Sequence, residues 1–239
     1  MRKILLCWLL LPLFATSQSK TVVNTFRAFP KPEKVAEFEK ALAAHAQKFH
    51  TGDWKWRTYE VISGPDAGAY HVTEGPNSWA QLDERKDISK EHTADWNMNV
   101  SPLITGQGSI GFAVYREELS SIALTDFADK MAITHIFPKQ GYGDTIAALI
   151  KKVKVVWDKS KEPVAVYQAS GSGPVQYILV FRYKTGWKER DPAFRKPFME
   201  RYKAEYNESG YNDYMSVIQQ FVEKSWTELL SFRADLSSK

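Results

Sequence analysis

The residues best suited to chemistry in this chain are its five histidines, and the question is what their spacing permits. Imidazole changes charge near neutral pH, and its neutral form ligates metals and moves protons. No pair shows a His-x-x-x-His or His-Glu-x-x-His spacing, and no dense carboxylate cluster accompanies them. The sequence therefore predicts no metal site. It also offers no Ser-His-Asp arrangement, so the catalytic residues, if the chain is an enzyme, stay unknown.

Two of the histidines fall in segments that read as strands. His71 lies between Tyr70 and Val72, and His135 lies between Thr134 and Ile136. We predict that both line a cavity between sheets, where they would bind an organic ligand or move protons together with Tyr59 and Tyr167. The alternative is that these four side chains are hydrogen-bonded polar groups of the core.

The other three histidines lie in segments that read as helical. His92 and Trp96 occur in a region that starts near Ser78, and we include both among the predicted ligand-binding residues. A polar histidine at the helix surface is the alternative for His92. His45 falls on a buried helical stripe and is expected to be a core histidine, whereas His50 is expected at the helix end, where a cation favours the helix dipole.

An internal repeat sets the framework that must position these residues. Three matches share an offset of 108 residues: Phe29-Pro30-Lys31 with Phe137-Pro138-Lys139, Tyr59 with Tyr167, and Trp79 with Trp187. A fourth match, Tyr115 to Ser120 with Phe232 to Ser237, has an offset of 117. The second copy is therefore expected to carry extra residues between its last helix and its last strand.

Each copy reads as strand, helix, strand, strand, helix, strand, which is the order of the ferredoxin-like fold. In copy one the strands are expected at 21–29, 54–62, 69–73 and 109–116, with a helix after Pro32 whose apolar residues recur every three or four positions. In copy two the central hairpin is expected at 164–169 and 176–183. The segment 196–206 reads as a solvated amphipathic helix.

This element order, given twice, resembles the dimeric α/β-barrel superfamily, with both halves fused in one chain. The resemblance implies an α+β fold in which two βαββαβ repeats pack sheet to sheet. That superfamily includes antibiotic-biosynthesis-type monooxygenases and chlorite-dismutase-like haem proteins. The segment from Trp79 to His92 is similar to the helix that carries the iron-ligating histidine in haem-degrading members, which makes haem a cofactor to test at His92.

The two ends and the composition suggest an exported protein. Arg2 and Lys3 precede the apolar run 4–14, and small residues follow, so residues 1–19 are expected to be a signal peptide. The repeats are then expected at 20–121 and 130–239, joined by a linker at 122–129. Cys7 is the only cysteine, which leaves no thiol after the signal. Basic and acidic residues are mixed, with a net charge of +4, so no nucleic-acid partner is expected.

These observations favour a periplasmic or secreted protein that binds a small, partly apolar molecule in its barrel. A haem-dependent or cofactor-independent monooxygenase is the alternative, and an interaction module with a solidly packed barrel is a third. No membrane span is expected in the mature chain, which would be a monomer or a homodimer.

Overall fold

The computed structural model describes residues 19–85, 88–171 and 173–239. The expected signal peptide therefore lies outside the described residues, apart from Ser19. Within the described parts of the chain, no helix is both long and apolar enough to cross a membrane.

The expected order of elements is present in both copies. The first repeat contains β1 (Val22–Pro30), α1 (Val35–Phe49), β2 (Trp56–Ser63), β3 (Tyr70–Asn77), α2 (Trp79–Glu84), α3 (Lys90–Asp95) and β4 (Ile104–Tyr115). The second contains β5 (Lys130–Pro138), α4 (Gly143–Lys159), β6 (Val164–Ser170), β7 (Tyr177–Tyr183), α5 (Phe198–Phe221) and β8 (Val222–Phe232). The α+β ferredoxin-like prediction is thus confirmed.

The last helix of the second repeat differs from the expectation. It has 24 residues and runs directly into β8, so the extra residues lie within α5 and not after it. Tyr202 on this helix is only 2% exposed and packs in the core of the second repeat. The segment 196–206 is therefore not a simple solvated helix, because one of its faces is buried against the sheet.

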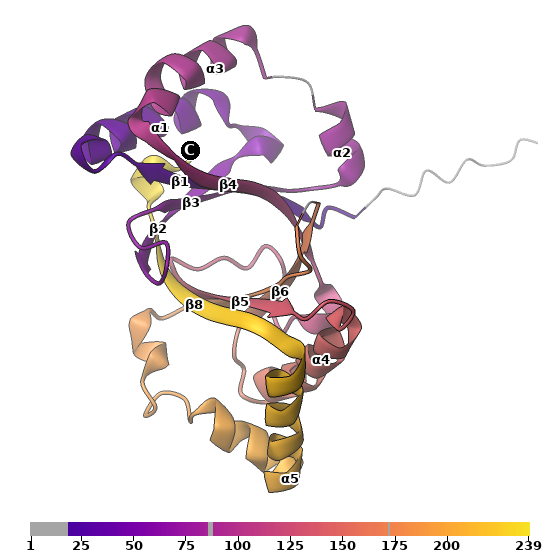
Figure 1. Ribbon diagram of the computed structural model, residues 1–239. Helices are drawn as coiled ribbons and strands as arrows, with labels where there is room; N and C mark the ends of the chain where they lie inside the picture. Colours follow the sequence, from indigo (N-terminus) through magenta and orange to yellow (C-terminus); the bar gives the residue numbers. More distant parts are fainter. Residues whose placement is uncertain (1–18, 86–87, 172) are drawn as a thin grey trace, which may run out of the picture.

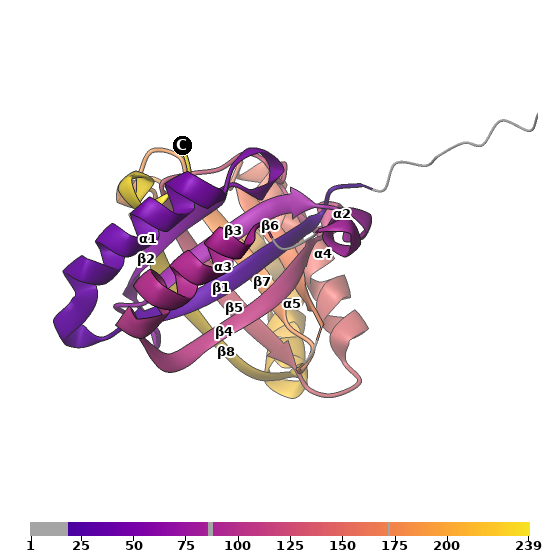
Figure 2. The same cartoon turned by 90° about the horizontal axis from the view of Figure 1, so that it is seen from above.

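The strands close into one barrel in the order β1-β3-β2-β8-β5-β7-β6-β4. Each repeat forms a four-stranded antiparallel sheet, and the two sheets join edge to edge where β2 pairs with β8 and β4 with β6. α1, α2 and α3 cover the outside of the first sheet, and α4 and α5 that of the second (Figures 1 and 2). The apolar core inside the barrel draws residues from both repeats, such as Tyr59 and Tyr167.

The tails that follow β4 and β8 cross to the other repeat in the same way. Ser120 Oγ accepts a hydrogen bond from the Val166 amide of β6, and Ser237 Oγ accepts one from the Thr58 amide of β2, at 2.8 and 3.0 Å. Leu236 is 2% exposed in the core of the first repeat. The similarity between 115–120 and 232–237 therefore reflects a shared role: the tail of each repeat packs against a strand of the other repeat and holds the two copies together.

Candidate functional site

The barrel encloses a cavity of about 530 Å³. Tyr59, His71, His135 and Tyr167, four of the residues expected to bind a ligand, all line it. They meet because β2, β3, β5 and β6 turn alternate side chains inward. The cavity reaches the surface near Ile110, which is 82% exposed.

One end of the cavity is organised around Glu228 on β8, which is completely buried. Arg27 Nη2 and His135 Nε2 approach the same carboxylate oxygen, at 2.5 and 3.1 Å. Gln176 Nε2 lies 2.6 Å from His135 Nδ1. Burial alone would raise the pKa of Glu228, but the bonds from His135 and Arg27 outweigh it and hold the pKa below the ordinary value. The carboxylate is therefore ionised.

His71 lies next to this cluster and is held neutral. Burial, followed by the nearby charges of Arg27 and His135, lowers its pKa to about 3, although Glu228 acts in the opposite sense. The cavity thus contains an uncharged imidazole beside a compensated ion pair.

The other end of the cavity holds two arginines. Arg182 is 4% exposed; it donates to the Tyr167 hydroxyl at 2.9 Å and to the carbonyls of Ala123 and Asp126. The Arg57 guanidinium lies 3.7 Å from the centre of the Phe127 ring. Burial lowers the pKa of Arg57. Tyr59 opposes this effect, whereas the positive charge of Arg182 lowers the pKa of Arg57 further.

Neither arginine is neutralised. Among residues 19–85, 88–171 and 173–239, no carboxylate lies within 4.0 Å of the guanidinium of Arg57 or Arg182. This end of the cavity therefore carries uncompensated positive charge. Phe127 belongs to the expected linker 122–129, so this segment forms part of the cavity wall as well as joining the repeats.

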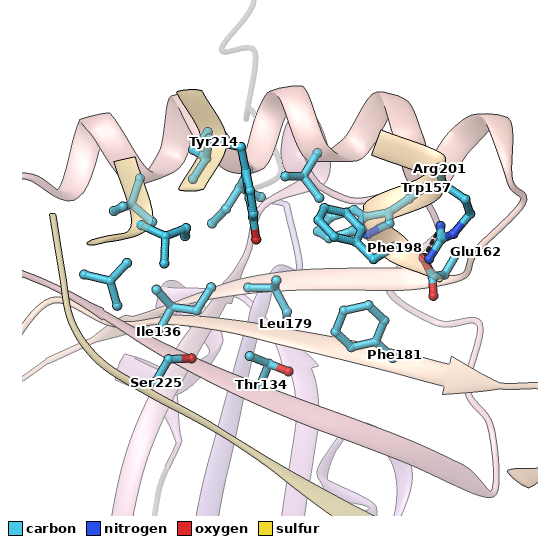
Figure 3. Close-up of a pocket in the computed structure, with 16 residues that line it drawn as sticks. Thr134, Ile136, Trp157, Glu162, Leu179, Phe181, Phe198, Arg201, Tyr214 and Ser225 are labelled. Atoms are coloured by element: carbon cyan, nitrogen blue, oxygen red, sulfur yellow. Dashed lines mark hydrogen bonds and ion pairs between the residues drawn. The ribbon is translucent and has the colours of Figure 1, made fainter. Parts of the chain in front are cut away.

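A second cavity, of about 340 Å³, lies between the second sheet and the helices α4 and α5. Its walls are mostly apolar, with Leu179 and Phe181 on the sheet side and Trp157, Phe198 and Tyr214 on the helix side (Figure 3). Burial raises the pKa of Tyr214 to about 12, so its hydroxyl stays protonated. This space lacks the uncompensated charge of the barrel cavity.

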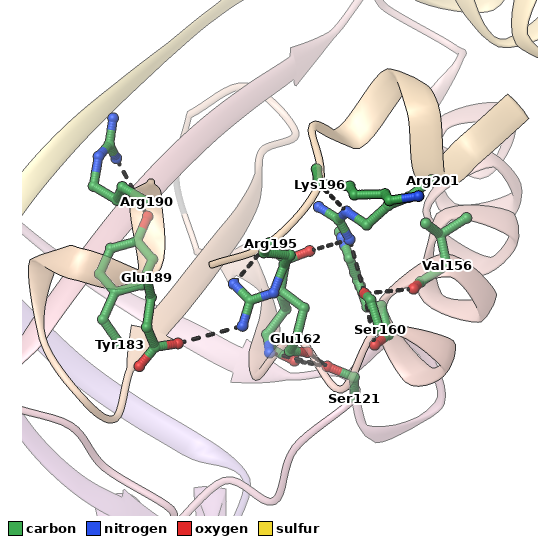
Figure 4. Close-up of polar contacts among 12 residues, drawn as sticks. Ser121, Val156, Ser160, Glu162, Tyr183, Glu189, Arg190, Arg195, Lys196 and Arg201 are labelled. Carbon is green, nitrogen blue, oxygen red and sulfur yellow. Dashed lines mark hydrogen bonds and ion pairs between the residues drawn. The ribbon is translucent and has the colours of Figure 1, made fainter. Parts of the chain in front are cut away.

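An ion-pair network fixes the start of α5 beside the second cavity (Figure 4). Glu162 accepts from Arg201 at 2.8 Å and from Arg195 at 3.4 Å. Arg195 also reaches Glu189 at 3.3 Å, and both glutamates are less than 10% exposed. The network attaches the segment before α5 to the end of α4.

The remaining histidines meet in the first repeat, outside the barrel. His45 of α1, His50 and His92 of α3 place ring nitrogens within 4.8 Å of one another. His45 Nδ1 lies 2.8 Å from the Asp95 carboxylate, and His50 Nδ1 lies 3.2 Å from that of Glu74. The sequence predicted no metal site, and its spacing rules did not reveal that these three histidines lie together. It arises because the chain turns back after α1 and brings His50 under α3.

One expectation for these histidines needs correction. His50 follows α1, but it is 1% exposed and burial lowers its pKa, so it is not a solvated cation at a helix end. His92 is half-buried and lies among rings, with centroids 4.8 Å from His45 and 5.4 Å from Phe49. Trp96, expected beside it as a ligand-binding residue, packs against Phe26 and His45.

A haem does not fit at His92 in this arrangement. Imidazole and aromatic rings lie around His92 at packing distance, so the porphyrin plane would have to displace them. The residues present suit a small cation better than a macrocycle.

Comparisons with known proteins show solved structures that share this fold. An anthrone oxidase-like protein has 13% identity and a TM-score of 0.58, covering 90% of this chain and 92% of its own. An inferred monooxygenase from Fusobacterium nucleatum has 12% identity and a TM-score of 0.54, covering 88% of this chain and 91% of its own.

An inferred monooxygenase from Lactobacillus acidophilus NCFM has 12% identity and a TM-score of 0.53, with 92% of this chain and 96% of its own covered. No protein-family model and no curated protein sequence matches the chain. The expected resemblance to the dimeric α/β-barrel superfamily is thus confirmed for the fold.

Sequence reasoning missed Glu228, Arg57 and Arg182. Glu228 shares one face of its strand with the apolar residues Trp226 and Leu230, and this alternation is a local signal that the face is buried. Arg57 and Arg182 also lie in strands where side chains alternate between the two faces of the sheet, and this alternation could have located them. It assigns Arg57 and Arg182 to the same faces as Tyr59 and Val180, the faces that line the barrel.

Proposed function

We propose that this protein binds a small, partly apolar molecule with an anionic group inside its barrel. The observation that carries the proposal is the pair Arg57 and Arg182, two cations that line the cavity without a carboxylate partner among the described residues. Guanidinium groups in a water-poor cavity favour carboxylate, phosphate or phenolate oxygens, with which they form charge-assisted hydrogen bonds.

The rest of the cavity suits the apolar part of such a molecule. Between the two polar ends, the wall is formed by Val23, Met131, Ile133, Ile178 and Val180. A volume of about 530 Å³ falls within the range of small-molecule sites, which are mostly apolar with a few fixed polar groups. The arginines would hold the anion, while His71 and Gln176 lie toward the opposite end.

The proposal is tested with matched ligands by titration calorimetry. A panel of aromatic and aliphatic carboxylates is compared with the corresponding amides, which have nearly the same shape and no charge. We expect some carboxylates to bind and their amides to bind at least about tenfold more weakly. If no carboxylate binds, or if acids and amides bind equally, the proposal is wrong.

Variants locate the binding site. Arg57→Met should weaken carboxylate binding by about tenfold or more, and Arg57→Lys should restore part of it because the charge returns without the planar fork. Arg190→Met is the matched control, because Arg190 is exposed and donates to Tyr183 on the helix side of the second repeat. Equal loss in both variants would place the ligand elsewhere.

A cofactor-independent oxygenase is the second candidate, and the same arginine pair favours it. A bound phenol or enol would ionise more readily beside two cations, and an electron-rich oxyanion is the form of substrate that reacts with O₂ without a cofactor. The names of the structurally similar monooxygenases and of the anthrone oxidase-like protein are in line with this candidate. Oxygen uptake with ionisable phenols, compared between the wild type and Arg57→Met, tests it.

Export is part of the proposal. Residues 1–19 would be removed as a signal peptide, which would place the binding protein in the periplasm or outside the cell. Intact-mass measurement of the protein from the exported fraction tests this, and an uncleaved chain in the cytoplasm would contradict it.

A further inference from the structure

Three histidines of the first repeat meet on the helix side of the sheet, beneath α3 and away from the barrel cavity. The Nε2 atoms of His45 and His50 lie 3.4 Å apart, and His92 completes a group whose ring nitrogens are within 4.8 Å. His45 and His50 are each 1% exposed. Only His92, which is half-buried, approaches the surface.

The hydrogen bonds decide which nitrogens carry lone pairs. A carboxylate accepts hydrogen bonds, so His45 Nδ1 donates to Asp95 and His50 Nδ1 donates to Glu74. In a neutral imidazole the other nitrogen, Nε2, is then an acceptor. Two acceptor nitrogens therefore face each other at 3.4 Å in a buried place, an arrangement that a shared cation would stabilise.

We propose that His45, His50 and His92 form a binding site for a divalent transition-metal ion, with Zn²⁺ as the principal candidate. With Zn–N bonds of about 2.05 Å, two ligands of a tetrahedral zinc lie about 3.4 Å apart. The pair of Nε2 atoms already has this separation. His92 has to approach by roughly 1.4 Å at most to reach it.

The surroundings have the features of a supported metal site. Histidine ligands generally donate their second nitrogen to a carboxylate, which orients the ring. Here Asp95 is held by Asn99 Nδ2 at 2.9 Å, and Glu74 by Arg85 at 2.8 Å and by Trp56 Nε1 at 2.9 Å. Both carboxylates are thus fixed before any metal arrives.

The ligand set determines which ions fit. Three neutral imidazoles suit Zn²⁺, Co²⁺, Ni²⁺ and Cu²⁺, whereas Mg²⁺ and Ca²⁺ require oxygen ligands. Three histidines also leave one position of the tetrahedron for water or a small anion, as in zinc sites with an open position. The Trp56 ring, stacked on His50 at 3.5 Å, and Trp96 restrict water around the ion.

The test uses the full chain, purified without a histidine tag and treated with a chelator. Titration with Zn²⁺ should show one equivalent bound, and Co²⁺ should give the visible absorption of a four-coordinate nitrogen site. Mg²⁺ and Ca²⁺ should not compete. His92→Ala removes the most accessible ligand and should weaken Zn²⁺ binding by more than about 100-fold, and Asp95→Asn by about 10- to 100-fold.

His135→Asn is the matched control, because it removes a histidine from the barrel and should leave Zn²⁺ binding unchanged. Circular dichroism and the Tm of each metal-free variant establish that it is folded, and Zn²⁺ should raise the Tm of the wild type and of His135→Asn more than that of His92→Ala or Asp95→Asn. If the folded wild type does not bind one equivalent of Zn²⁺, or if His92→Ala binds it equally well, the proposal is wrong.

Discussion

Arg27 and Glu228, 201 residues apart, form an ion pair with an Nη2–Oε1 distance of 2.5 Å inside the barrel. Arg27 belongs to the first strand of one repeat and Glu228 to the last strand of the other. The pair therefore forms only when the two repeats have closed on each other, and it links the fold to the cavity.

Replacing Glu228 with glutamine should destabilise the protein by about 3 kcal/mol, because the buried charge of Arg27 would keep only the more distant and more exposed carboxylate of Asp66, 3.6 Å from its Nε atom. Chemical denaturation measures the loss. Asp53→Asn is the control: it breaks the exposed pair with Lys20 and should cost much less stability, because water screens that pair. Equal effects of the two substitutions would show that the buried pair has no special role.

Acidification should destabilise the protein through His71. Its pKa is about 3 when folded and near the ordinary 6.5 when unfolded, so the unfolded chain binds the additional proton. The stabilisation is present above about pH 6.5 and is lost as the pH falls toward 3, by up to about 1.4 kcal/mol per pH unit.

Comparison of the wild type with His71→Gln isolates this contribution, since other titrating groups are shared. The difference in the free energy of unfolding between the two proteins should change with pH between 6.5 and 4 and level off above pH 7. A constant difference across this range would mean that His71 titrates normally in the folded state.

Neither repeat should fold as a stable monomer. Separation would expose the edges of β2 and β4 and the inner face that includes Tyr59, and it would remove Leu236 from the core of the first repeat. Expression of 20–121 and 129–239 as separate chains, followed by size-exclusion chromatography, tests this. Mixing them should give a 1:1 complex, whereas a monomeric fragment with a sharp thermal transition would contradict the expectation.

The start of α5 should loosen when Glu162 is replaced with glutamine. Arg195 and Arg201 would lose the carboxylate that joins them, at a cost of about 1.5–3 kcal/mol. Amide hydrogen exchange should increase in the first turns of α5 and remain unchanged in β1 and β3. Asp158→Asn, which breaks an i,i+4 surface pair with Lys154, should cost about 0.3–0.5 kcal/mol.

Local patterns in the sequence were sufficient for the architecture. The repeated Phe-Pro-Lys segment, the apolar spacing of α1 and the strands expected at 54–62 and 69–73 each depend on residues close together in the chain. Such features predict a strand, a helix or a turn before any packing takes place. The alternation of side chains in strands also placed Tyr59, His71, His135 and Tyr167 on inward faces, where the structure has them.

Contacts between distant segments were decided only by the tertiary structure. Glu228 faces inward because β8 pairs with β5 in a register that sets Glu228 opposite Ile133, and a shift of one residue would have turned it to the other face. No local pattern in β8 reveals that register.

The histidine cluster has a similar origin. His45 and His50 are five residues apart, which on a continuous helix would place them about 140° from each other around the axis. They meet because α1 ends at Phe49 and His50 adopts an extended backbone, with φ −102° and ψ 90°. The sequence by itself determined the repeated elements and their buried faces. The closure of the barrel and the end of one helix decided which polar side chains share a site, because these contacts depend on strand register and packing across the whole chain.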